Sequence, residues 1–219
     1  MPTSRARKSA TFPTPSLPFT WWLQLVVSLL LLGCAQPSLT NYPPKAGTAW
    51  VALGDSLTAG IGAEPGDDYP SQLGRRLGRE ILNFGVPGDT TADALRRLDT
   101  VLAADPRVVL VCLGGNDSLQ RLPLETTLTN LRAIITGLQQ HGAFVVLIGV
   151  RSATVRDQYH RPFRQLAREL GALYIPNILR DVLGNGARMA DPIHPNAAGY
   201  AFIAERLERE LRAAKVTEF

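Results

Sequence analysis

The sequence Val51-Ala52-Leu53-Gly54-Asp55-Ser56-Leu57 starts as an apolar strand and breaks into a turn that begins with glycine. Short continuous apolar runs are typical of strands in parallel sheets, where both faces are buried. A serine at the end of such a strand becomes a nucleophile only when a base and an anion site come from elsewhere in the chain. The rest of the sequence therefore decides what Ser56 does.

Beyond residue 49, apolar runs alternate with helical patterns. The clearest helical pattern spans 125–141, where leucine and isoleucine recur at spacings of three and four and Gly142 ends the pattern. Other helices are expected from the capping sequence Asp89-Thr90-Thr91 through Leu102 and over residues 195–215. Strands are expected at 50–53, 81–86, 107–113, 144–150 and 173–175. The alternation predicts an α/β fold of three layers, with helices on both faces of a central parallel sheet of about five strands.

The first 33 residues form a predicted signal peptide of the lipoprotein type. They combine a basic start with an apolar run from Trp21 to Leu32, which is shorter than the roughly 20 apolar residues that a membrane-spanning helix needs. Export is therefore favoured over a permanent membrane anchor. Residues 34–48, rich in Pro, Ser and Thr, are expected to be a linker, and residues 49–219 a single folded domain.

The two cysteines have different expected roles. Leu31-Leu32-Gly33-Cys34 resembles the bacterial lipobox, whose cysteine is acylated after cleavage. Acylation of Cys34 would tether the protein to the periplasmic side of the cell envelope, because more than one acyl chain gives stable anchoring. The alternative is cleavage after Ala35, which would release a soluble periplasmic or secreted protein. Cys112 lies in an apolar run and is expected to be buried, so no disulfide is predicted.

The formal net charge of +4 originates in the leader. Arg5, Arg7 and Lys8 precede every acidic residue, and beyond residue 33 the chain has 20 basic against 19 acidic residues. A body this close to neutrality lacks the basic surface that nucleic-acid binding needs. We expect a monomer whose partner is a small-molecule substrate. No metal or organic cofactor is expected, and neither cysteine has the spacing of a zinc ligand.

Residues with useful chemistry stand where the predicted strands end. Ser56 follows the first strand, Gly85 ends the second and Asn116 follows the third, while Asp191 and His194 lie in the loop before the last helix. Parallel sheets bind ligands beyond the carboxyl ends of their strands, so these segments are predicted to meet at one edge. Each motif alone is typical of an ordinary turn, whereas their occurrence together and in this order favours a catalytic site.

The chain has three histidines that could activate a serine. His141 ends a predicted helix, where contact with the last carbonyl groups is its expected role, and His160 lies in a predicted loop that contains arginines. His194 follows Asp191 by three residues, in the loop that the predicted sheet brings to the edge of Ser56. Asp191 would accept a hydrogen bond from Nδ1 of His194, which fixes the tautomer and leaves Nε2 facing the serine.

These motifs resemble the SGNH, or GDSL-type, hydrolase family, and within it the bacterial thioesterase I, lysophospholipase L1 and arylesterase group. The resemblance covers the chain from about residue 49 to the last helix and is carried by four blocks, at 54–60, 83–90, 113–117 and 191–196. It implies a flavodoxin-like fold in which Ser56, His194 and Asp191 are catalytic. It also implies an oxyanion hole formed by the backbone amides of Ser56 and Gly85 and the side-chain amide of Asn116.

The function expected from the resemblance is a serine esterase that hydrolyses carboxylic esters or thioesters of acyl chains through an acyl-serine intermediate. Residues 61–69, 118–124 and 151–159 follow strands or their turns and are expected to wall the acyl groove. One alternative is a carbohydrate O-acetylesterase, which a shallow polar pocket would favour. The other is a non-catalytic lipid-binding lipoprotein on the same scaffold.

Overall fold

The computed structural model describes residues 38–150 and 159–219, and its centre is a parallel sheet. The sheet has five strands in the order β2-β1-β3-β4-β5, which confirms the predicted parallel sheet. The order reverses between β1 and β3, and parallel sheets bind ligands at such a point. The strands are β1 (Ala49–Gly54), β2 (Ile81–Gly85), β3 (Pro106–Cys112), β4 (Phe144–Ile148) and β5 (Leu173–Ile175).

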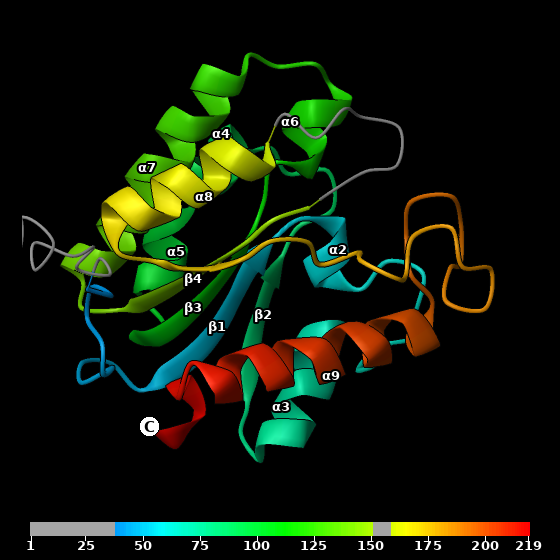
Figure 1. Cartoon of the computed structure of the whole chain (residues 1–219), viewed down its shortest axis with the longest axis horizontal. Coiled ribbons are helices and arrows are strands. Elements are labelled where there is room, and N and C mark those ends of the chain that lie inside the picture. Colours follow the sequence, from blue (N-terminus) through cyan, green and yellow to red (C-terminus); the bar gives the residue numbers. More distant parts are fainter. Residues whose placement is uncertain (1–37, 151–158) are drawn as a thin grey trace, which may run out of the picture. The chain divides into compact units, whose positions relative to one another are not determined.

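Helices cover both faces of the sheet, as the sequence predicts (Figure 1). One face carries α3 (Tyr69–Leu77) and α9 (Ala197–Ala213), which is followed by the short 3-10 helix η1 (Val216–Glu218). The other face carries α4 (Thr91–Arg96), α5 (Leu98–Leu102), α7 (Leu124–Gln140) and α8 (His160–Leu170). Two short helices, α2 (Ser56–Ala59) and α6 (Gly115–Leu119), follow β1 and β3 directly and so stand at the carboxyl edge of the sheet.

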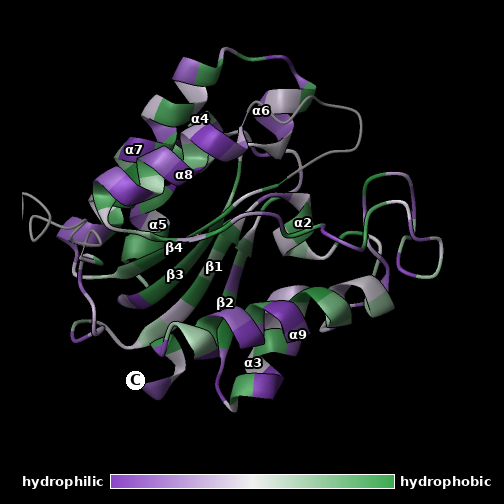
Figure 2. Cartoon of the chain, viewed as in Figure 1, coloured by the Kyte–Doolittle hydropathy of each residue, from purple (hydrophilic) through white to green (hydrophobic). Residues whose placement is uncertain are grey.

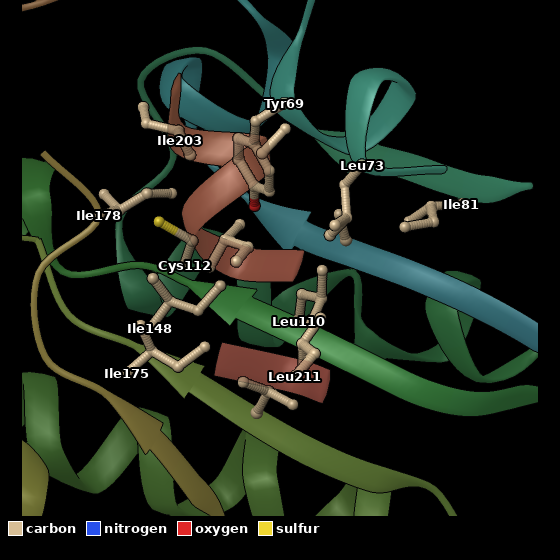
Figure 3. Packing of buried hydrophobic residues seen from close by; sticks show 14 of the residues in the cluster. Tyr69, Leu73, Ile81, Leu110, Cys112, Ile148, Ile175, Ile178, Ile203 and Leu211 are labelled. Atoms are coloured by element: carbon tan, nitrogen blue, oxygen red, sulfur yellow. The ribbon is translucent and has the colours of Figure 1, made fainter. Parts of the chain in front are cut away.

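The side chains of the central strands alternate between two cores. In β3, Leu110 and Cys112 point to the core under α3 and α9, while Val109 and Val111 point to the core under the other helices. Figure 3 shows Cys112 close to Tyr69 of α3 and Leu110 further along β3, in the same cluster of buried side chains. Both faces are therefore apolar, which explains the uninterrupted apolar runs and the hydrophobic colour of the strands in Figure 2. Cys112 is fully buried with a free thiol, which confirms its predicted role.

The long helices begin and end at recognisable caps. Helix α7 buries Leu131, Ile135 and Leu138, and Gly142 follows it with a φ of 93°, a conformation that favours glycine. Helix α9 is capped by Asn196, whose side-chain oxygen accepts the Gly199 backbone N–H at 3.0 Å. Both helices match their predicted ranges closely.

The helix expected over residues 89–102 is in fact two helices. Helix α4 starts at a capping box formed by Thr90 and Asp93 and ends at Arg96. Arg97 then leaves helical geometry, with φ −108° and ψ 16°, and α5 begins at the next residue. The prediction of one continuous helix was wrong because leucine periodicity continues through a position whose side chain bonds away from the helix, at the sheet edge.

The described part of the predicted linker is held against the domain. Asn41 donates to the carbonyl oxygens of Gln139 and Ala143 at 2.8 and 2.9 Å, and Tyr42 packs on Phe144 with ring centroids 5.7 Å apart. Residues 38–48 therefore belong to the folded unit, and only 34–37 of the predicted linker lie outside the described residues. The predicted signal peptide and Cys34 also lie outside them. No helix within 38–150 or 159–219 is both long and apolar enough to cross a membrane.

Candidate active site

Ser56 stands at the start of α2, directly beyond the end of β1. Asp55 caps this helix, because its Oδ1 accepts the Leu57 backbone N–H at 3.0 Å. The turn is tight: a Cβ on Gly54 would lie 2.0 Å from the Thr58 hydroxyl, so only glycine fits. The Ser56 N–H has no acceptor within the described residues, as expected for the first amide of a helix. The serine therefore presents both a hydroxyl and a free backbone donor.

The loop before α9 brings a histidine to this hydroxyl. Nε2 of His194 lies 3.0 Å from Oγ of Ser56, and Nδ1 of His194 lies 2.7 Å from Oδ2 of Asp191. The other oxygen of Asp191 accepts the backbone N–H groups of Ile193 and His194, each at 2.8 Å. The three side chains expected from the sequence thus form a continuous chain of hydrogen bonds.

The electrostatics of this loop favour an ionised aspartate. The bond with the His194 ring is the largest cause that lowers the pKa of Asp191 to about 2, and the Ile193 and His194 amides add to it. Asp191 is thus a carboxylate at neutral pH, with one oxygen on the backbone and one on the ring. Such a carboxylate keeps the proton of a neutral imidazole on Nδ1 and stabilises an imidazolium.

Asn116 reaches the same edge from α6. Its Nδ2 donates to the backbone oxygen of Asp89 at 2.9 Å and lies 3.5 Å from Oδ2 of Asp55. The neighbouring Asp117 is fully buried and accepts bonds from the backbone and hydroxyl of Thr91 on α4 and from Thr127 on α7. These bonds fasten α6 to the adjacent helices, so the position of Asn116 is set by buried contacts.

Asp55 is a buried carboxyl group close to these side chains. Only 2% of its surface is exposed, and desolvation raises its pKa to about 6, against the lowering effects of the Leu57 N–H and of His194. Asp55 therefore loses its proton near pH 6 instead of near pH 3.8. The hydrogen bonds of Asp55 make it a brace for α2 rather than a partner of the Ser56 hydroxyl.

The geometry at Gly85 corrects its expected role as an oxyanion donor. Its N–H already donates to Oδ1 of Asn83 at 2.9 Å. A Cβ at this position would lie 2.1 Å from the Ala59 backbone nitrogen, so the glycine allows α2 to pack closely on β2. Gly85 thus has a packing role.

Gly88, three residues later, has a backbone N–H that is not already bonded within the described residues. The residue lies in a turn closed by a bond from the Asp89 N–H to the Val86 oxygen and has a φ of 88°. The next residue, Asp89, is the one whose carbonyl binds Asn116. The signal was readable, because proline followed by glycine, as in Pro87-Gly88, is typical of a type II turn.

The pocket beside Ser56 is mainly apolar. Its polar wall contains the hydroxyl, His194, Asn116 and Asp55, and the remaining lining is aliphatic: Leu57, Leu119, Val150, Leu179, Leu183 and Ile193, with Gly115 between. Among the described residues with large exposed apolar side chains, Leu119 and Ile193 belong to this lining. The pocket can therefore take an apolar group next to the serine.

The expected groove walls are only partly correct. Of the three predicted segments, 118–124 contributes Leu119, 61–69 contributes nothing to this pocket, and 151–158 lies outside the described residues. Leu179 and Leu183, from the turns after β5, were missed. No periodic pattern marks these two leucines, because their position depends on how the loop after β5 folds back.

The other two histidines lie elsewhere. His141 caps the C-terminal end of α7. His160 is the first residue of α8, not part of a loop as expected, and its Nδ1 lies 3.1 Å from the Tyr174 hydroxyl. Of the three histidines, His194 is the one that the structure brings to Ser56.

Comparison with known proteins places this site in a family context. Residues 52–202 match the sequence profile of the GDSL-like lipase/acylhydrolase family. Esterase TesA of Pseudomonas aeruginosa is 30% identical over 192 residues, which cover 82% of this chain and 95% of that protein. The thioesterase 1/protease 1/lysophospholipase L1 of Escherichia coli K12 is 29% identical over 203 residues, 89% of this chain and 93% of that protein. A crystal structure of TesA superposes with a TM-score of 0.71 at 28% identity, covering 76% of this chain and 99% of that one.

Proposed function

Because the chain belongs to the GDSL-like lipase/acylhydrolase family and is a hydrolase of the esterase kind, we propose that it cleaves carboxylic esters or thioesters of acyl chains through an acyl-serine intermediate. Ser56 is the nucleophile, His194 the general base and acid, and Asp191 the group that orients the histidine. One observation carries the proposal: the hydrogen-bonded chain from Ser56 Oγ through both ring nitrogens of His194 to Asp191.

Acylation begins when Oγ of Ser56 attacks the carbonyl carbon of the substrate. Nε2 of His194, 3.0 Å away, takes the hydroxyl proton as the new C–O bond forms. The imidazolium is stabilised by the carboxylate of Asp191, and the carbonyl oxygen becomes an oxyanion. The intermediate then collapses, the bond to the alcohol or thiol breaks, and His194 returns the proton to that leaving group.

Deacylation repeats these steps with water as the nucleophile. His194 removes a proton from the water as it attacks the acyl carbon, and then returns a proton to Oγ of Ser56 when the ester bond breaks. The products are the free acid and the original serine. Every proton in the cycle passes through Nε2, so the mechanism needs the Nδ1–H tautomer that Asp191 favours.

The oxyanion would be held by three N–H donors. These are the backbone amides of Ser56 and Gly88 and Nδ2 of Asn116. The second N–H of this amide, beyond the bond to Asp89, makes only a long 3.5 Å contact with Oδ2 of Asp55, which an oxyanion would replace. The free N–H groups of Ser56 and Gly88 support this assignment over the one that used Gly85. Loss of one such donor typically lowers the rate by about a hundred- to a thousandfold.

The lining of the pocket supports an acyl substrate. Aliphatic side chains surround the serine, including Leu179 and Leu183, and they match an acyl chain better than a sugar hydroxyl surface. A carbohydrate O-acetylesterase would need polar partners there. The intact hydrogen-bonded triad likewise supports an enzyme over a non-catalytic lipid-binding protein.

Export and anchoring are proposals of their own. We propose that residues 1–33 are a signal peptide and that Cys34 is acylated, which would tether the domain to the cell envelope on the periplasmic side. The basis is the sequence pattern alone. A Cys34→Ala variant should lose incorporation of labelled palmitate, and incorporation equal to wild type would refute lipidation at this residue.

Hydrolysis of p-nitrophenyl esters from acetate to palmitate tests the activity and the acyl preference together. We expect turnover that depends on Ser56 and extends to esters longer than acetate. Folded wild-type protein without turnover at any chain length would refute the enzyme. Activity restricted to acetate would favour the O-acetylesterase, and activity unchanged in Ser56→Ala would refute the mechanism.

A further inference from the structure

Arg97 lies between α4 and α5 and bonds to the segments that carry the oxyanion donors. We propose that it is a positioning residue for the oxyanion hole: it fastens the ends of β1 and β2 and the turn at Gly88 into one rigid frame. The proposal rests on the proposed esterase function. Arg97 does not line the pocket and therefore acts through other residues.

Three acceptors surround the guanidinium group. Nε of Arg97 donates to Oδ2 of Asp89 at 2.7 Å, and Nη2 donates to the backbone oxygens of Phe84 at 3.0 Å and Gly54 at 3.2 Å. The side chain of Arg97 is 22% exposed and that of Asp89 is 11% exposed. The ion pair is therefore largely protected from water, where charge-assisted hydrogen bonds hold geometry most firmly.

Two of the acceptors lie within two residues of a proposed backbone donor. Gly54 precedes Ser56 by two residues, and its carbonyl fixes the end of β1 from which the serine turn departs. Asp89 directly follows Gly88, so its bound carboxylate restrains the turn that presents the Gly88 amide. The backbone carbonyl of Asp89 also accepts Nδ2 of Asn116. A single side chain thus links all three donor segments.

The bond to Phe84 completes the frame. Phe84 is the next-to-last residue of β2, just before the Val86–Asp89 turn. The N–H of Val86 in turn donates to the Gly54 oxygen at 3.0 Å. The Gly54 carbonyl is therefore held from two sides, by the turn and by Arg97. The two loops that supply backbone donors cannot shift independently while these bonds persist.

The break between α4 and α5 fits this role. Arg97 is the one residue between the two helices, and its neighbour Arg96 has a 70% exposed side chain paired with Asp93. The side chain of Arg96 is thus on the surface, whereas that of Arg97 is largely buried beside the ends of β1 and β2. A planar guanidinium serves several fixed acceptors at once, which a lysine ammonium does not do with the same geometry.

The test compares Arg97→Met and Arg97→Lys with the surface control Arg96→Met. Displacing donors without removing them should lower kcat by about 10- to 100-fold and leave KM within about twofold, because the donors act on the transition state. Arg97→Lys should lose less activity than Arg97→Met, because a lysine keeps a positive charge opposite Asp89 but cannot bind all three acceptors as the planar guanidinium does. Arg96→Met should match wild type.

A second readout separates positioning from loss of folded protein. Affinity for an alkyl boronic acid, whose serine adduct carries an oxygen in the oxyanion site, should fall in parallel with kcat. Affinity for a straight-chain hydrocarbon of the same length, which fills the apolar pocket but has no oxygen, should not change. Both affinities are measured on folded protein. If Arg97→Met does not fold, the same comparison is made with Arg97→Lys. In an Asn116→Ala background, Arg97→Met should cost less than in wild type, because the same donor frame is already damaged.

Three outcomes would overturn the proposal. Wild-type kcat in folded Arg97→Met, equal losses of boronate and hydrocarbon affinity, or full additivity with Asn116→Ala would each show that Arg97 does not act through the donors. Failure of the esterase function is a different result, because wild-type protein would then lack Ser56-dependent turnover altogether.

Discussion

Replacing Asp191 with asparagine should change the tautomer of His194 and leave the other contacts of the loop in place. The carboxylate bonds the Ile193 and His194 backbone amides with one oxygen and the ring with the other. Asparagine keeps an oxygen for the two amides, so the loop should keep its shape. Its NH2 group can only donate to Nδ1, which moves the ring proton to Nε2 and leaves Ser56 facing a donor instead of a base.

The expected loss of activity is far larger than the loss of stability. A histidine protonated on Nε2 cannot accept the serine proton, and this change of tautomer lowers kcat by about 10⁴-fold in a serine triad. That factor is equivalent to roughly 5 kcal/mol of transition-state stabilisation. The Asp191 side chain is 42% exposed, so losing the bond between its carboxylate and the imidazole should lower the free energy of unfolding by under about 1 kcal/mol.

The assay is kcat and KM on p-nitrophenyl butyrate, with thermal unfolding recorded on the same samples. Asp67→Asn is the matched control, because Asp67 is similarly exposed at 46% and pairs with Arg75 at 3.8 Å. It should retain wild-type kcat. If folded Asp191→Asn stays within tenfold of the wild-type kcat, Asp191 does not orient the base and this reading of the loop is wrong.

Three further changes probe separate parts of the site. Asp55→Asn should remove a pH dependence: the folded pKa of about 6 lies above the ordinary value of 3.8, so wild-type stability relative to the variant should fall by roughly 2 kcal/mol as pH rises from 4 to 7. Chemical denaturation across that range measures it, and a flat difference would contradict the raised pKa. A Cβ on Gly88 would meet no atom within 4 Å, but the residue has a φ of 88°, so Gly88→Ala should cost about 1 to 2 kcal/mol of stability. The variant keeps the backbone N–H, and we expect the strained turn to shift this donor and to lower kcat at least about tenfold; unchanged kcat would show that the conformation of the turn does not position it. Leu183→Trp should lower kcat/KM for palmitate about tenfold more than for acetate, and equal effects on both esters would place the acyl chain elsewhere.

The fold was predictable because its strands are buried on both faces. Residues such as Leu110 and Val111 must be apolar whichever way they point, so each central strand appears as an uninterrupted run. The helix break at Arg97 was not predictable, because leucine spacing continues through it and the acceptors of Arg97 come from β1, β2 and the Asp89 turn.

The site was predictable in its side chains and less so in its backbone. Ser56, His194 and Asp191 stand at strand ends or loop positions that a parallel sheet brings to one edge. The choice between Gly85 and Gly88 depended on which N–H was already bonded, and the Asn83 side chain that decides it lies two residues before Gly85. The aliphatic pocket wall at Leu179 and Leu183 depended on how a loop folds back, which periodicity does not report.

Covalent labelling of Ser56 tests the central claim most directly. An alkyl fluorophosphonate reacts with an activated serine, whose Oγ displaces fluoride from phosphorus, and peptide mass spectrometry then locates the adduct. The account predicts one adduct per chain, on the peptide that contains Ser56, with activity lost in proportion to labelling and no adduct in His194→Ala. An adduct at another residue that abolishes activity, or full activity after complete labelling of Ser56, would contradict it.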